Sequence, residues 1–105
     1  MLENEINALL AAPADGESAP HLDRLEHALT SGYARALELE AESLRLQRRI
    51  GEVAAAIAST DDEQARELAA LAERRSAAQN QHDRLRALLH RLRDRTTAAR
   101  VAAQT

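Results

Sequence analysis

A seven-residue repeat of apolar side chains over residues 22–57 is the feature that most limits how this chain can fold. The first position of the repeat is held by Leu22, Leu29, Ala36, Ser43, Ile50 and Ile57. The fourth position is held by Leu25, Gly32, Leu39, Leu46 and Val53. A heptad pattern sustained over this length is typical of a coiled-coil seam rather than of a helix in a globular core.

A second seam runs through residues 61–103, and two of its positions hold ionisable side chains. Its members are Leu68, Leu71, Arg75, Ala78, His82, Leu85, Leu89, Leu92, Thr96 and Ala99. A polar residue in a seam fixes the register of the paired helices, and this is the role expected for Arg75 and His82. We expect His82 to face Glu38 and Glu42 on the first seam.

The segment at residues 59–63 decides whether the two seams form one helix or two. Thr60 and Glu63 form a capping box, and Asp61 and Asp62 suit the positive end of a helix dipole. The regular alternation of three- and four-residue steps between seam positions is also interrupted here. We therefore favour a tight turn near residues 59–61 and an antiparallel hairpin. The alternative is one continuous helix in a parallel dimer.

Composition supports an all-α fold and removes most catalytic chemistry. Ala and Leu supply 24 and 16 residues, and Tyr33 is the one aromatic residue. Such a chain favours helices over strands. All 14 basic residues are Arg and there is no Cys, which excludes disulfides, thiolate zinc sites, Cys nucleophiles and Schiff-base lysines. No two histidines lie four residues apart, and there is no Gly-rich phosphate loop. We therefore expect no enzyme, no metal and no cofactor.

Three segments follow from these patterns. Residues 1–12 contain a short amphipathic helix, residues 13–20 hold both prolines and form a linker, and residues 21–105 form the hairpin. The arms of the hairpin are expected at about 21–58 and 61–103, with Ser18 as a candidate N-cap. Facing residues should have numbers that sum to about 120, so that Gly32 lies opposite Leu88 and Leu89.

Charge and hydropathy indicate a water-soluble chain. The net charge is −3, and no apolar run approaches the length of a membrane span. The start of the chain is acidic, whereas a secretory signal begins with basic residues. We expect a cytoplasmic protein with no membrane partner and no small-molecule substrate.

An apolar flank on the first arm suggests a protein partner. Tyr33, Leu37, Ala41 and Leu44 widen the apolar face beyond what a two-helix seam covers. Either the N-terminal helix covers part of this flank or another chain does. We expect self-association, with a homo-oligomer as the default, or binding to another protein.

The acidic residues at the turn allow a second interpretation. Asp61, Asp62 and Glu63 would stand at the tip of a long antiparallel coiled coil. This arrangement resembles bacterial factors that insert such a finger into the secondary channel of RNA polymerase, where acidic residues approach the catalytic Mg²⁺. The resemblance implies a transcription regulator. The alternative is that these acidic residues have no function beyond stabilising the N-terminus of the second long helix through the helix dipole.

An arginine-rich end allows a third interpretation. Its candidate residues are Arg84, Arg86, Arg91, Arg93 and Arg95. They flank a leucine stripe, as charges do beside a coiled-coil seam, and no aromatic side chain lies among them for base stacking. The acidic N-terminal helix is expected to fold back onto this end. Nucleic-acid binding is therefore the less favoured role of these arginines.

The preferred function is a small, non-enzymatic helical protein that mediates protein–protein interaction as an adaptor, assembly factor or chaperone-like protein. Transcription regulation through the acidic tip is the alternative, and nucleic-acid binding through the arginines is the third possibility.

Overall fold

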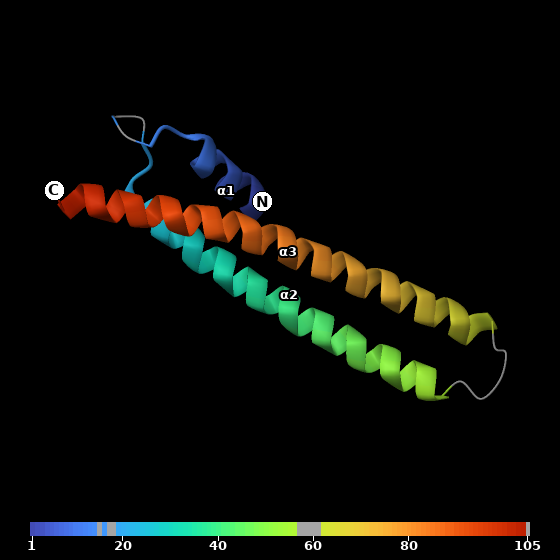
Figure 1. The fold of residues 1–105 in the computed structure, drawn as a ribbon. Coiled ribbons are helices and arrows are strands. Elements are labelled where there is room, and N and C mark those ends of the chain that lie inside the picture. Colours follow the sequence, from blue (N-terminus) through green and yellow to red (C-terminus); the bar gives the residue numbers. More distant parts are fainter. Residues whose placement is uncertain (15, 17–18, 57–61, 105) are drawn as a thin grey trace. The chain divides into compact units, whose positions relative to one another are not determined.

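The computed structural model contains three α-helices, and it describes residues 1–14, 16, 19–56 and 62–104. The helices are α1 (Leu2–Ala11), α2 (Leu22–Ala56) and α3 (Asp62–Gln104) (Figure 1). No strand occurs in these ranges. The expected all-α helical hairpin with a short N-terminal helix is confirmed, and a continuous helix from residue 22 to 104 is excluded. The proposed turn residues 59–61 and the candidate cap Ser18 lie outside the described residues.

The chain forms two compact units, and α2 and α3 contribute to both. The first unit comprises Met1–Ala36 and Arg84–Thr105, and the second comprises Leu37–Asp83. Each unit has its own buried residues, so each is described separately below.

The first unit is a three-helix arrangement with α1 packed on the paired ends of α2 and α3. Ile6 and Leu9 of α1 are buried, because the amphipathic spacing turns both to the same side of the helix. Gly32 is buried at a close approach of the helices. A methyl group added there would lie 3.3 Å from Leu89 Cγ and 3.6 Å from Ile6 Cδ1. The buried α2 and α3 side chains of this unit are Leu25, Ala28, Ala36, Leu85, Leu89, Leu92 and Thr96.

The second unit is a pair of helical segments with a narrow seam. Leu46, Val53 and Leu71 form its apolar cluster, and Ile50 and Leu68 pack against it. Ser43 is buried on the seam, and its hydroxyl donates a hydrogen bond of 3.4 Å to Gln79 Oε1. A two-helix seam buries one stripe of each helix, so most other side chains of this unit remain in contact with water.

The two ionisable members of the second seam differ in their environment. Arg75 is exposed, because its long side chain extends from the seam and places the guanidinium in water. Its Nη2 lies 3.5 Å from Gln47 Oε1. His82 is half-buried, and its Nδ1 lies 3.3 Å from Asp83 Oδ1. The expectation that His82 faces Glu38 and Glu42 stays a prediction.

The antiparallel register agrees with the expected one. Gly32 lies against Leu89 in the first unit, and Ser43 contacts Gln79 in the second. Across the α2–α3 contacts, the residue numbers of each hydrogen-bonded pair sum to between 116 and 126. Among the described residues, no helix has the length and apolar content that crossing a membrane would require.

Candidate protein-contact surface

The main candidate surface is an apolar stripe on α2 in the second unit, formed by Leu37, Ala41 and Leu44. The spacing of four and then three residues places them on one side of the helix. Leu37 is 66 % exposed and Leu44 is 54 % exposed, and Ala41 between them is also exposed. We call these three residues the α2 stripe.

The α2 stripe points away from the seam of the second unit. Leu39 and Leu46, two residues from the leucines of the stripe, are 2 % and 6 % exposed because they pack toward α3. At 100° per residue, the stripe lies on nearly the opposite side of α2. Packing within the second unit therefore leaves these two leucines in water.

Charged residues of both signs border the α2 stripe. Glu38 and Arg45 follow the two leucines by one residue each and lie along one border of the stripe, and Glu40 lies along the other. All three are exposed. An apolar centre with a charged border is the usual composition of a protein-contact surface.

Tyr33, which the sequence groups with the stripe, belongs to the first unit. Its side chain is half-buried, and the guanidinium carbon of Arg86 lies 5.9 Å from the centre of its ring. A cation over an aromatic face at this distance is an attractive contact. Tyr33 is therefore engaged within its own unit by one of the arginines assigned to the basic end.

The candidate acidic tip is described only in part. Asp62 and Glu63 occupy the first turn of α3, where negative charge is favoured by the helix dipole. Asp61 lies outside the described residues. A role for these acidic residues beyond the helix end stays a prediction.

Most of the candidate basic residues make contacts inside the first unit. Arg84 Nε lies 3.8 Å from Glu3 Oε1 of α1, and Arg86 covers Tyr33. Arg95 donates hydrogen bonds to two backbone carbonyl oxygens near the end of α1. Arg91 and Arg93 are exposed. The acidic N-terminal helix thus lies against this end of α3, as the sequence predicts.

The contact between Arg95 and α1 is one that the sequence did not reveal. Arg95 Nη1 donates to the carbonyl oxygen of Leu10 at 3.0 Å, and Nη2 donates to that of Ala12. The last carbonyls of a helix have no partner within it, and α1 has no basic residue in its own last turn. A guanidinium from α3 supplies both the missing donors and a favourable charge at the negative end of the helix dipole.

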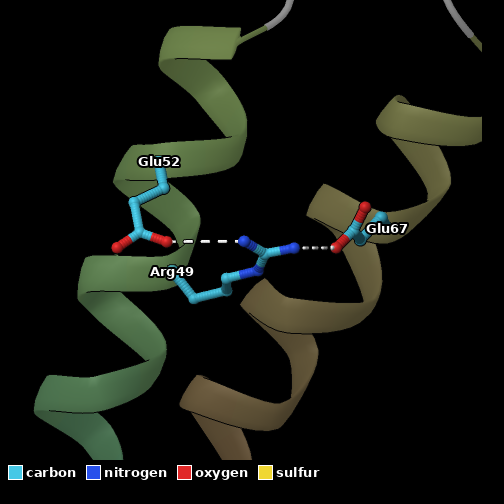
Figure 2. A network of polar contacts seen from close by, with 3 residues as sticks. All are labelled: Arg49, Glu52 and Glu67. Atoms are coloured by element: carbon cyan, nitrogen blue, oxygen red, sulfur yellow. Dashed lines mark hydrogen bonds and ion pairs between the residues drawn. The ribbon is translucent and has the colours of Figure 1, made fainter.

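A second unpredicted contact joins α2 to α3 in the second unit (Figure 2). Arg49 extends from α2 between two carboxylates, with Nη1 3.4 Å from Glu52 Oε2 and Nη2 3.1 Å from Glu67 Oε1. The hydrogen bond with Glu52 and that with Glu67 raise the pKa of the Arg49 guanidinium. The three side chains are about half exposed to water, so the network orients the helices more than it stabilises them.

A shallow groove in the second unit lies beside this network, and Arg49 and Glu67 are among the residues that line it. The residues that line it include Leu46 and Leu71 and the arginines Arg45 and Arg74. The groove is wide open, whereas ligand pockets enclose most of the surface of what they bind.

Within the described ranges, no group of three His, Cys, Asp or Glu side chains is arranged to hold a metal ion. Comparison with protein-family models, curated proteins and solved structures gives no match to this chain.

Proposed function

We propose that this chain is a non-enzymatic helical protein whose function is to bind another protein chain through the α2 stripe. The observation that carries the proposal is the exposure of Leu37 and Leu44 on the side of α2 that faces away from α3. The surface is a single apolar helix face, which fits a partner that packs a helix against it.

The energetics of the two leucines support this proposal. Full burial of a leucine side chain is worth about 1.5–3 kcal/mol, and more than half of each of these side chains is exposed. Covering both therefore contributes roughly 2–3 kcal/mol from one protomer. Because association costs at least about 4 kcal/mol in lost freedom of motion, the partner must bury apolar surface of its own, and the contact falls short of an obligate interface.

The other two candidate surfaces have weaker support. Arg84, Arg86 and Arg95 already contact α1 or Tyr33, so only part of the basic end remains for a phosphate backbone. The acidic residues at the start of α3 are accounted for by the helix dipole. Among the described residues of these two surfaces, no leucine is as exposed as Leu37 and Leu44 are.

Affinity capture with matched variants tests the proposal. The tagged wild-type chain is compared with the double variant Leu37→Gln/Leu44→Gln and with a control, Arg66→Gln/Glu73→Gln, that changes exposed residues of α3. Proteins retained from extracts of the native host are identified by mass spectrometry, and an untagged copy of the chain counts as a partner. All three proteins should give the same helical circular dichroism spectrum, because every substituted residue is exposed.

We expect a partner that the wild type and the control retain in equal amounts and that the stripe variant retains at least roughly tenfold less. If the stripe variant retains the same proteins as the wild type, or if none of the three retains a partner, the proposal is wrong. Retention that depends on Arg91 and Arg93 and falls steeply with salt would indicate nucleic-acid binding instead.

A further inference from the structure

We propose that the surface of α2 and α3 beneath α1 is a second protein-contact site, and that a helix of a partner protein replaces α1 there. The partner helix has the chemistry that α1 shows to fit: negative charge in its first turn and two large aliphatic side chains three residues apart. The site belongs to the first unit and the α2 stripe to the second, so this inference goes beyond the proposed function.

The apolar part of the site accepts two side chains of α1. Ile6 is 0 % exposed and Leu9 is 2 % exposed. Ile6 enters where Gly32 leaves room, because a Cβ on Gly32 would lie 3.6 Å from Ile6 Cδ1. The site is therefore shaped for aliphatic side chains on one face of a helix.

Arginines of α3 mark both ends of the site. Arg84 Nε lies 3.8 Å from Glu3 Oε1 in the first turn of α1. Arg95 donates to the carbonyl oxygens of Leu10 and Ala12 where α1 ends. A bound helix is thus recognised by an acidic side chain at its start and by its last carbonyl groups.

The helical form of α1 depends on this site. The helix has 10 residues, and a helix shorter than about 12–15 residues is marginal in water. Within the described residues, the side chain of its N-cap, Met1, makes no capping hydrogen bond. Its last carbonyls receive their side-chain donors from Arg95 of α3. Release of α1 therefore opens a local unit, while α2 and α3 keep their own seam.

Grooves beside α1 leave space for a larger helix. One groove of about 340 Å³ lies between α1 and α3, and its lining includes Glu3, Asn7 and Leu88. Another, also about 340 Å³, lies between the end of α1 and the start of α2, and its lining includes Ala12 and Arg24. A longer helix, or one with a leucine in place of Asn7, would make contacts that α1 does not make.

Competition with α1 selects a different protein over a second copy of this chain. A segment tethered to its own site competes at an effective concentration of about 1 mM. The α1 of a second copy offers only the same contacts, so it does not displace the tethered helix at micromolar concentration. A partner helix succeeds if it carries its own N-cap and fills the grooves.

A synthetic peptide with these improvements provides the probe. It comprises residues 1–14, labelled with fluorescein, with Met1→Ser to supply an N-cap and Asn7→Leu to fill the groove beside Leu88. Fluorescence anisotropy measures its binding to the full chain. The same peptide with the further change Ile6→Gln is the matched control, because it lacks the side chain that enters beside Gly32.

We expect weakening of the chain's own α1 to strengthen peptide binding. The full-length variant Ile6→Ala should bind the peptide at least roughly tenfold more tightly than the wild type, and the milder Ile6→Val roughly threefold more tightly. The control peptide should not bind. Leu37→Gln/Leu44→Gln in the chain should leave the affinity unchanged, because the α2 stripe lies in the other unit.

Hydrogen exchange shows whether the peptide displaces α1. At saturation, amide exchange in the chain's own α1 should rise at least roughly tenfold, with α2 and α3 unchanged. The proposal is overturned if no chain binds the peptide up to about 1 mM, if the Ile6 variants bind it no more tightly, or if α1 exchange does not rise. Binding lost in the Leu37→Gln/Leu44→Gln chain would place the peptide on the α2 stripe, and a wild type that dimerises by exchange of α1 would make the second copy the occupant; both results refute this proposal and leave the proposed function standing.

Discussion

Replacement of Gly32 by alanine should destabilise the protein, although alanine is the better helix former. Gly32 lies within α2 of the first unit and is buried. An added Cβ would overlap Leu89 Cδ2 and would lie 3.3 Å from Leu89 Cγ. Leu89 is only 1 % exposed, so it has little free space into which it can move.

Two opposing effects set the magnitude. Alanine in place of glycine inside a helix gains about 1 kcal/mol from helix propensity. An extra methyl group in a well-packed core costs about 1–3 kcal/mol, since neighbouring side chains must leave their preferred rotamers. We therefore expect Gly32→Ala to lower the free energy of unfolding by about 1 kcal/mol.

Gly51 provides the matched control. It lies in the same helix, is exposed, and has no atom within 4 Å of the position that a Cβ would occupy. Gly51→Ala should therefore show the propensity gain alone and raise the free energy of unfolding by about 0.5–1 kcal/mol. Urea denaturation followed by circular dichroism at 222 nm, a standard helix wavelength, measures both values.

A change at Leu89 should reverse the sign at Gly32. Leu89→Ala removes the overlapping atoms and leaves a cavity, at a cost of about 2–5 kcal/mol. In that background, Gly32→Ala should stabilise the protein, because its methyl group enters vacated space and keeps its propensity gain. If Gly32→Ala stabilises the wild type as much as Gly51→Ala does, the close packing argued for the first unit is wrong.

The remaining predictions concern three side chains with polar contacts. Arg95→Gln should increase amide hydrogen exchange in α1 at least roughly tenfold, because the last carbonyls of α1 lose their donors, while exchange in the second unit stays unchanged. His82→Leu should raise the free energy of unfolding by about 1 kcal/mol in thermal melts, because leucine extends the seam; a lower melting temperature would identify His82 as a satisfied polar partner. Arg49→Gln should leave the melting temperature nearly unchanged at high salt and lower it slightly at low salt, because its ion pairs are exposed.

The heptad pattern is sufficient to predict the helices and their pairing. The leucines at the first and fourth positions need burial, and a partner helix with the same period provides it. The capping box and the loss of phase at residues 59–63 then favour the antiparallel hairpin over a continuous helix, and the hairpin sets the register. The meeting of Gly32 and Leu89 is one consequence of this register that the structure confirms. The outward direction of Leu37 and Leu44 follows in the same way, because they fall between the seam positions.

The contacts of individual long side chains could not be predicted in this way. Several arginines of α3 are compatible with a contact to α1, and only the three-dimensional path of the N-terminal segment selects Arg95. Arg49 likewise has several acidic residues within reach in sequence, and the spacing of α2 and α3 decides that Glu52 and Glu67 are its partners. Sequence period determines which face a residue occupies, but a flexible side chain can reach several neighbours from that face.

Photo-crosslinking inside the cell tests the central claim, contact between the α2 stripe and another protein chain, most directly. A photoreactive residue is placed at Ala41 in the middle of the stripe, and in a control protein at Glu73, an exposed position of α3 in the same unit. We predict a protein adduct from position 41, with far less from position 73, and loss of the adduct when Leu37→Gln/Leu44→Gln is added. Equal adduct formation at both positions, or none at position 41, would contradict it.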